Sequence, residues 1–456
     1  MKSLRITIAL LSTLGLAACS FAPKYERPDL PMPETYSVAA STDTIPLDWW
    51  TLFGDTTLNA LVEEALAANQ DLAAAAARVE QARAIAGVAK AELYPVITAG
   101  GSGSRTQIAE RTAGAAENPF NSFDLIGAIS YELDFWGKLR NASKAARNEM
   151  LATAEGRRNV ELAVTADVVS TYFDLLSFDR QLMVARSTLA SRRDAVRLQQ
   201  LRYDAGAISQ LDLAQAQAEL ASTEATVPVF EREMRQTENR LGVLLGRIGG
   251  SVVRGDSLDA IGAPEVPVGL PSEIIARRPD VLAAEYRMIA SNANIGVARS
   301  AYLPSIALTG YAGWESNDLS ALIMKNTDIW SASVSVFQNI FAPGRTQRQV
   351  ELAWGLHRET LAGYIQSVQV AFAEVEDALV ARRTSLEVRE AEDREVTART
   401  RALELAQIRY DAGDSSYIEV LDAQRQLFQA QLLQTAAKRG ELNSSVLLFK
   451  ALGGGW

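Results

Sequence analysis

An internal repeat constrains this chain more than any other feature of its sequence. Residues 202–220 read RYDAGAISQLDLAQAQAEL and residues 409–427 read RYDAGDSSYIEVLDAQRQL, so one pattern recurs after 207 positions. GVAKAELYPVITAGG at 87–101 likewise recurs as GVARSAYLPSIALTG at 296–310, after 209 positions. Self-similarity at a constant spacing indicates two copies of one structural unit. The predicted divisions are an extended N-terminal segment at 19–57, repeat 1 at 58–250, a linker at 251–271 and repeat 2 at 272–456.

Two very long helices are predicted from the spacing of prolines, which break helix interiors. No proline lies between Pro119 and Pro228 or after Pro343. Within these windows, residues 138–203 and 345–412 are rich in Ala, Leu, Arg, Glu and Gln, which are good helix formers. At about 1.5 Å per residue, each helix would be roughly 100 Å long, far longer than an ordinary globular domain requires.

Shorter helices are predicted on either side of each long one. Apolar residues recur in steps of three and four over 58–90 and 210–249, which is the pattern of a coiled-coil seam. Repeat 2 has corresponding stretches at 272–300 and 416–452. Each repeat is therefore expected to contain a long helix packed against two shorter ones. A coiled-coil tether would explain these seams but not the segments between them.

Those intervening segments alternate with a period of two and predict one β-hairpin in each repeat, at 93–135 and 302–341. In FDLIGAISYELDF (123–135) and WSASVSVF (330–337), apolar or aromatic residues alternate with polar ones. About ten residues per strand is enough to cross a bilayer. The alternative is a pair of amphipathic hairpins covering a soluble core. Because the smallest membrane barrels need about eight strands, four strands require further copies of the chain. Strand count alone permits a dimer with eight strands as well as a trimer with twelve.

The N-terminus has the layout of a bacterial lipoprotein signal. In MKSLRITIALLSTLGLAACS, two basic residues precede an apolar run, which predicts a signal peptide at 1–18. Cys19 is the only cysteine, and LAAC resembles the site at which the signal is cut before a lipidated cysteine. Lipidation fits this position better than a lone buried cysteine acting as a small hydrophobic residue. Ser20 at the next position favours sorting to the outer membrane.

Charge and chemistry exclude several classes of function. Removal of residues 1–18 takes away two of the 45 basic residues and none of the 55 acidic ones, so nucleic acid is not an expected partner. The single histidine, His357, lies in a predicted helix, and GGSGS (100–104) lacks the last glycine of a nucleophile elbow. We predict no enzyme activity, no metal site and no cofactor apart from the covalent lipid on Cys19.

Two stretches resemble the TolC/OprM outer-membrane factors, in the lipoprotein (NodT-like) branch that serves tripartite efflux pumps. They are DWWTLFGDTTLNALVEEALAANQDLAAAAARVEQA (48–82) and GLPSEIIARRPDVLAAEYRMIASNANIGVARSAYLPSIALTGYAG (269–313). The resemblance covers essentially the whole mature chain. It implies a mainly α protein with a small β part, acting as the outer-membrane exit duct of an efflux pump.

The resemblance also implies an assembly and a location. Three copies would combine four strands each into one 12-stranded outer-membrane β-barrel, and their helices would continue it as a periplasmic α-barrel. The implied partners are a periplasmic membrane-fusion adaptor, an inner-membrane RND-type transporter and outer-membrane lipid. Alternatives are a lipid-anchored periplasmic adaptor, a coiled-coil scaffold or the outer-membrane component of a protein secretion system. The exported substrate stays open.

The repeated YDAG motif predicts the tip of a helical hairpin. Gly206 and Gly413 permit the left-handed backbone that lets a helix end and the chain reverse. The pairs Ser209 with Asp212, and Ser416 with Glu419, fit capping boxes that would start the returning helices. Capping is at least as good an explanation for these two acids as a role in gating.

Resemblance to the family implies that the tips close the periplasmic end of the tunnel. Glu419 and Asp422 would ring the aperture, while Asp212 and Tyr410 would hold neighbouring helices together. Six carboxylates around one axis would favour cations. One departure stands out, because Ser415 replaces the arginine found in TolC, so that inter-helix ion pair cannot form.

Overall fold

The computed structural model describes residues 20–33, 36, 45–109, 111, 118–268 and 274–455. The predicted signal peptide and Cys19 lie outside the described residues. Two compact units divide the chain. One comprises the described residues up to Asp29 together with Val79–Thr153 and Ala283–Tyr364, and the other comprises the described parts of Leu30–Arg78, Ala154–Leu282 and Ile365–Trp456.

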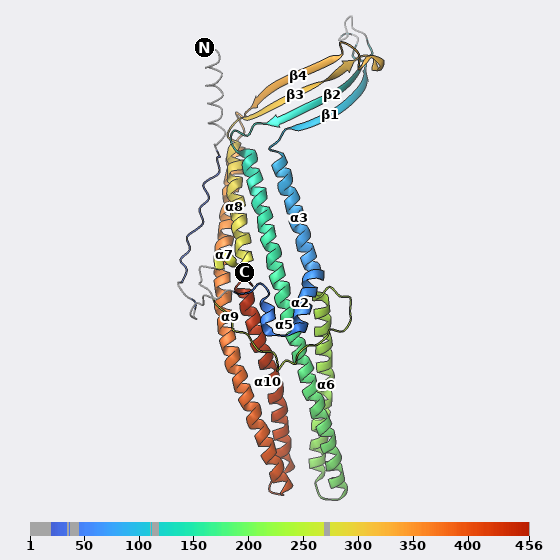
Figure 1. Ribbon diagram of the computed structural model, residues 1–456, viewed down its shortest axis with the longest axis vertical. Helices are drawn as coiled ribbons and strands as arrows, with labels where there is room; N and C mark the ends of the chain where they lie inside the picture. The colour runs from blue at the N-terminus through green and yellow to red at the C-terminus, as the bar shows by residue number, and fades with distance from the viewer. Residues whose placement is uncertain are drawn as a thin grey trace. The chain divides into compact units, whose positions relative to one another are not determined.

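The helices confirm the two-fold internal repeat. The long helices α5 (Lys138–Asp204) and α9 (Arg345–Asp411) both contain 67 residues, and each residue of one has its counterpart 207 positions away in the other. The same spacing relates α6 (Gln210–Leu244) to α10 (Tyr417–Ala451), each of 35 residues. The pair α3 (Gln70–Ala91) and α8 (Pro279–Ser300), each of 22 residues, completes the set. In Figure 1, α5 and α6 form one helical hairpin, and α9 and α10 form another.

The prediction of one continuous helix over 58–90 is wrong. The chain forms α2 (Thr56–Ala68) and α3, separated at Asn69, whose ψ of 130° is extended. The side-chain oxygen of Asn69 accepts hydrogen bonds from the amides of Asp71 and Leu72, at 2.9 and 3.2 Å. Its side-chain nitrogen donates to the carbonyl of Leu244 at 2.8 Å. One asparagine therefore caps the start of α3 and satisfies a carbonyl at the end of α6.

Two other predicted boundaries shift for local reasons. The helix expected over 210–249 ends at Leu244, because Gly246 takes a φ of 73°. The helix expected over 272–300 is described as α7 (Ile274–Arg277) and α8, which begins at Pro279. Proline suits the first position of a helix, where its missing amide costs nothing.

The buried Arg278 side chain gives a structural role to one residue of the ARRPDV stretch (276–281), which runs into the start of α8. Its guanidinium forms a bidentate ion pair with the Asp280 carboxylate, at 3.0 and 2.7 Å. It also pairs with Glu374 of α9 at 2.6 Å and donates to the carbonyl of Ala451 at 2.9 Å. Arg278 therefore links the start of α8, the interior of α9 and the end of α10 within the second unit.

The four strands form a single antiparallel sheet in the order β1-β2-β3-β4 (Figure 1). They confirm both predicted hairpins, and the pairing of β2 with β3 joins the hairpin of repeat 1 to that of repeat 2. A short 3-10 helix, η4 (Leu319–Ala321), lies between the last two strands. The strands are β1 (Val96–Thr106), β2 (Phe120–Glu132), β3 (Ser305–Ser316) and β4 (Asp328–Phe337).

The register brings most of the apolar positions of the four strands to one face. Leu125 of β2 pairs with Gly101 of β1 and with Trp314 of β3, and residues opposite each other in a sheet share a face. The other face is mainly polar, and Thr309 bonds Ser333 there at 2.7 Å. It also carries the apolar residues Val96, Ile126, Tyr311, Ile329 and Phe337. The apolar face includes Ile97, Ala99, Gly101, Gly103, Phe123, Leu125, Gly127, Ile129, Tyr131, Ile306, Leu308, Gly310, Ala312, Trp314, Trp330, Ala332, Val334 and Val336. Four polar residues, Arg105, Asn121, Ser316 and Asp328, lie on the same face at one end of the strands.

The N-terminal segment packs along α8 in the first unit. Glu285 of α8 is buried and accepts hydrogen bonds from Tyr25 at 2.8 Å and from the Arg27 guanidinium at 2.7 Å for each oxygen. Asn292 of α8 donates to the carbonyl of Pro23 at 2.8 Å. Because these contacts recur along one helix, residues 20–29 have a defined path on the protein.

Candidate functional site

The two hairpin tips have the same backbone geometry. Gly206 has a φ of 71° and Gly413 a φ of 79°, so the left-handed backbone predicted for both is present. A Cβ atom at either glycine would meet nothing within 4 Å, so the positive φ alone favours glycine there. Amides after each helix close the turn in the same pattern: Gly206 to Tyr203, Ala207 to Arg202, Gly413 to Tyr410 and Asp414 to Arg409.

The first tip contains the predicted capping box. The Ser209 hydroxyl accepts from the Asp212 amide at 3.2 Å, and the Asp212 carboxylate accepts from the Ser209 amide at 3.1 Å. Asp212 also accepts from the Ser209 hydroxyl at 2.8 Å. The carboxylate of Asp212 is therefore engaged at the start of its own helix.

The capping box predicted at the second tip is wrong. Ser416 stands at the N-cap of α10 but makes no side-chain cap bond. The carboxylate of Glu419 instead accepts from the Arg409 guanidinium at 3.0 Å, across the turn from α9 to α10. Glutamate is one methylene longer than the aspartate at the matching position, so it can reach the arginine in the last turn of the preceding helix. The two tips therefore share a backbone but differ in electrostatics.

A polar contact between α5 and α9 connects the two hairpins near their tips. Arg202 donates to the Tyr410 hydroxyl at 2.8 Å, and its guanidinium carbon lies 5.3 Å from the centre of the Tyr410 ring. Such a cation over an aromatic ring is attracted to the ring face. Tyr410 also packs against Tyr417, with ring centres 5.2 Å apart. Tyr417 belongs to a small apolar cluster with Ala216, Val420 and Leu421, and Tyr410 packs against this cluster.

Asp422 lies one helical turn beyond Glu419 on α10 and pairs along its own helix. Its carboxylate accepts from the Arg425 guanidinium at 2.6 Å and from the Gln426 side-chain amide. The Asp422 side chain remains 44% exposed. The structure therefore brings Tyr410 together with α5, Asp212 with its own cap, and Glu419 and Asp422 with arginines.

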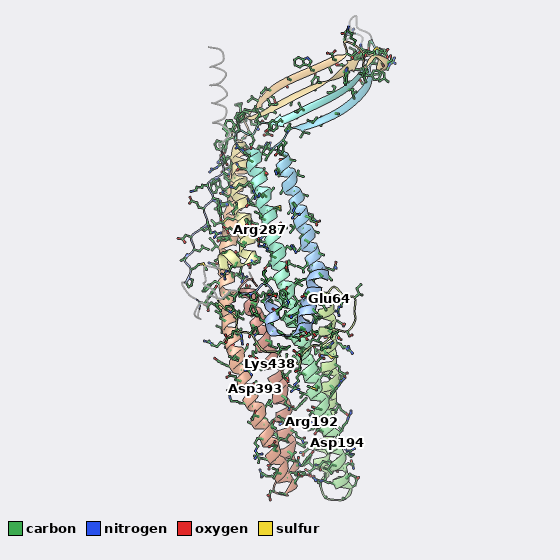
Figure 2. All side chains as sticks on the ribbon, in the orientation of Figure 1. Glu64, Arg192, Asp194, Arg287, Asp393 and Lys438 are labelled. Atoms are coloured by element: carbon green, nitrogen blue, oxygen red, sulfur yellow. The ribbon has the colours of Figure 1, made fainter. Side chains whose placement is uncertain are left out.

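A second contact joins the hairpins further from the tips, at Arg192 of α5 (Figure 2). The guanidinium of this buried arginine pairs with Glu219 of α6 at 3.0 Å and lies 5.6 Å from the ring centre of Phe428 of α10. Burial lowers the pKa of the Arg192 guanidinium. Arg192 thus ties three helices together, a role that sequence reasoning missed.

Sequence reasoning also missed a repeated set of exposed apolar residues near the tips. Exposed apolar side chains occur at equivalent positions of the two hairpins. The residue numbers of each equivalent pair differ by 207. The repeat places apolar residues at these matching positions in the sequence, but only the structure shows that they are exposed. The pairs, with their exposed fractions, are Leu198 (48%) and Leu405 (45%), Leu201 (64%) and Ile408 (61%), and Leu211 (65%) and Ile418 (48%).

His357 has a structural environment in the first unit. A ring nitrogen of His357 lies 3.0 Å from the Ser291 hydroxyl, and the Trp354 ring packs edge-on at 6.0 Å between centres. Burial lowers the pKa of this imidazole. Across the described part of the chain, no group of three or more His, Cys, Asp and Glu side chains could hold a metal ion.

Comparison with known proteins identifies the family. The model of the outer membrane efflux protein family matches residues 61–247 and 270–454. The chain belongs to the outer membrane efflux protein family. It is 35% identical to the probable efflux pump outer membrane protein SepC of Pseudomonas putida, over 100% of this chain and 98% of the relative. It is 34% identical to the cation efflux system protein CusC of Escherichia coli, over 97% of each.

Solved structures of this family share the fold. The CmeC outer membrane channel of Campylobacter jejuni matches with a TM-score of 0.91 at 28% identity, covering 96% of this chain and 95% of that one. A crystal structure of CusC matches with a TM-score of 0.88 at 32% identity, covering 96% of this chain and 100% of that one. No helix among the described residues of this efflux protein is long and apolar enough to cross a bilayer. The protein is an outer-membrane efflux channel, and this family is one of channels rather than enzymes.

Proposed function

We propose that three copies of this chain form the exit duct of a tripartite efflux pump, which passes substrate from an inner-membrane transporter to the outside. The observation that carries this proposal is the sheet, with one mainly apolar face, one mainly polar face and two unpaired edges at β1 and β4. Unpaired edges expose backbone hydrogen-bonding groups that are satisfied only by further strands. Three sheets of four strands would pair these edges and turn the polar faces toward a common bore.

The hairpin tips are proposed to be the periplasmic gate of this duct. Arg202 and Tyr410 hold the two hairpins of one chain together at their ends. Glu419 and Asp422 lie on one helix close to the same end, and three copies would place six carboxylates around the axis. Such a ring favours cations over anions where its carboxylates are not neutralised by their partners Arg409 and Arg425.

The repeated apolar residues near the tips are proposed to receive a periplasmic adaptor. The three residues of each hairpin lie on both sides of its turn, and they are exposed in both hairpins. In a trimer they would recur six times around the ring, which suits a partner that presents several copies of one apolar surface. Gly206 and Gly413 keep these turns tight between the docking residues.

A lipid on Cys19 is proposed to anchor the N-terminus in the outer membrane. The adjacent residues 20–29 dock along α8 through Tyr25, Arg27 and Asn292. The docked segment would hold the lipidated end close to the protein surface. Loss of the lipid would then weaken membrane attachment without removing the channel fold.

The inner-membrane transporter is proposed to select the cargo. Relatives of similar identity are named for toluene efflux in Pseudomonas putida and for cation efflux in Escherichia coli. A duct that serves such different cargoes needs a wide polar bore rather than a dedicated binding site.

The molar mass of the detergent-extracted protein tests the assembly. Light scattering with correction for bound detergent should give three chains per particle, and the heated sample should migrate as a single chain. A monomer that stays in solution without detergent would contradict the proposal and favour a lipid-anchored adaptor or scaffold.

A further inference from the structure

The internal repeat predicts contacts between copies from contacts within one copy. Within the chain, α5 of repeat 1 meets α9 of repeat 2 through Arg202 and Tyr410. In the ring proposed above, repeat 2 of one copy would face repeat 1 of the next copy in the same way. The counterpart of Arg202 in repeat 2 is Arg409, and the counterpart of Tyr410 in repeat 1 is Tyr203.

Tyr203 is available for this second contact. Its side chain is 38% exposed, and no hydrogen bond of its hydroxyl occurs within the described part of the chain. Its backbone carbonyl closes the first tip, as that of Tyr410 closes the second, so the two tyrosines stand at equivalent points of equivalent turns.

Glu419 competes for the arginine that would make the contact. Arg409 bonds Glu419 within its own hairpin at 3.0 Å. Arg202 has no acidic partner among the described residues, because the matching acid, Asp212, is shorter and is held in its capping box with Ser209. Arg202 of the first tip therefore contacts the other hairpin, whereas Arg409 of the second tip contacts Glu419 within its own hairpin.

We propose that Arg409 of one copy binds Tyr203 of the neighbouring copy when Glu419 releases it, which gives the ring a second, switchable set of tip contacts. The proposal rests on the trimeric ring. It makes Glu419 a residue that controls an interface between copies, in addition to any effect of its charge on ions. Three permanent contacts within chains would then alternate with three switchable contacts between chains.

Thiol crosslinking tests the predicted proximity, with an internal control supplied by the repeat. Cys19 is the only native cysteine, so paired cysteines can be introduced without other thiols nearby. A short bifunctional thiol reagent is preferable to a disulfide, because arginine and tyrosine are long and their Cβ atoms lie beyond disulfide reach. The double variant Arg409→Cys with Tyr203→Cys should yield covalent dimers and trimers on a denaturing gel. The double variant Arg202→Cys with Tyr410→Cys should be crosslinked within one chain, so its band on the gel should stay at the mass of a single chain.

The outcomes separate this inference from the function on which it rests. If the intrachain pair reacts and the particle is a trimer, but the pair at 409 and 203 gives no covalent oligomer, the proposed contact is absent while the channel proposal stands. If no trimer forms, the ring itself fails.

A coupling experiment tests the role of Glu419. Glu419→Gln should lower the single-channel current several-fold, since released arginines tighten the tip. The same substitution in a Tyr203→Leu background should change the current much less, because the neighbouring acceptor is gone. Asp212→Asn, the matching change in repeat 1, should not depend on Tyr203. If Glu419→Gln changes the current equally in both backgrounds, Glu419 does not control the contact with Tyr203. The effect of the substitution is then due to the loss of its negative charge alone.

Discussion

Arg202 of α5 bonds the Tyr410 hydroxyl of α9 at 2.8 Å and lies over the same ring at 5.3 Å. Hydrogen bonding and cation–π attraction therefore act on one pair of side chains from two repeats. The matching pair of repeat 2 and repeat 1, Arg409 and Tyr203, does not meet within the chain. This asymmetry between two nearly equivalent tips gives the proposed gate its particular chemistry.

Loss of the Arg202 contact should loosen the tip. Hydrogen bonds to charged groups contribute about 1.5–3 kcal/mol and cation–π contacts about 0.5–2 kcal/mol. Arg202→Ala removes both and should raise single-channel conductance or open probability about tenfold or more, whereas Tyr410→Phe removes only the hydrogen bond and should have a smaller effect. Arg197→Ala is the matched control, since Arg197 forms an ion pair with Asp194 on the exposed face of its own helix. Equal currents for Arg202→Ala and Arg197→Ala would exclude a gating role for this contact.

Removal of the Asp422 carboxylate should reduce cation preference or raise conductance. The side chain is 44% exposed near the tip and would be repeated three times around the bore. Reversal potentials in a salt gradient measure the preference directly. Asp194→Ala is the control, because it removes an exposed carboxylate of α5 that is not part of the proposed ring. An unchanged current trace and reversal potential would remove Asp422 from the gate.

A charge on the apolar face of the sheet should block membrane insertion. A lysine or arginine facing lipid at mid-bilayer costs about 2–4 kcal/mol per chain, and the cost is repeated in each copy. Val334→Lys should therefore sharply reduce the amount of protein in the outer-membrane fraction. Ser333→Lys, one residue earlier on β4 and on the opposite face, should be tolerated. Equal behaviour of the two variants would show that the faces do not differ in exposure to lipid.

Glu238 should make part of the stability depend on pH in acid. Burial alone raises the pKa of its carboxyl, but hydrogen bonds from Arg254, the Val252 amide and Arg235 outweigh burial and lower this pKa to about 2. A lowered pKa means that the folded state holds its proton less tightly than the unfolded state. The stabilisation is therefore present above the ordinary value of 4.5 and is lost as pH falls from 4.5 toward 2.

Thermal unfolding of the detergent-solubilised protein between pH 5 and about 2 checks this expectation. Glu238→Gln should lower the unfolding temperature at neutral pH and flatten its fall in acid. Glu231→Gln removes a more exposed partner of Arg186 and should leave the pH profile unchanged. A wild-type profile for Glu238→Gln would contradict the assignment.

Asn69 should contribute to stability through both helices that it caps. Asn69→Ala removes two bonds to the start of α3 and one to the end of α6, and N-cap loss typically costs about 1 kcal/mol. The unfolding temperature should fall by more than in Gln70→Ala, which loses one exposed bond to Ala68. A smaller effect at Asn69 than at Gln70 would show that the break is held by other contacts.

Sequence patterns predicted the large elements because each has a strong local cause. Proline-free stretches predicted α5 and α9, alternation predicted the four strands, and the tip glycines predicted two reversals of the chain. Because the sequence is repeated, each of these elements was indicated by two copies of the same pattern. Asn69 escaped this reasoning because its three hydrogen bonds depend partly on Leu244, which is distant in sequence.

The chemistry of the tips was less predictable than their position. Ser209 with Asp212 and Ser416 with Glu419 fit the same motif, yet only the first pair caps its helix. The difference depends on whether an arginine across the turn is within reach of the acid. Contacts such as Arg202 with Tyr410 join residues that are 208 positions apart, so no local pattern could indicate them.

Current recording across a planar bilayer tests the central claim most directly. Purified trimer added to one side should give stepwise, cation-preferring currents, and Val334→Lys should give none. A protein that dissolves without detergent and never conducts would contradict a channel built from shared sheets.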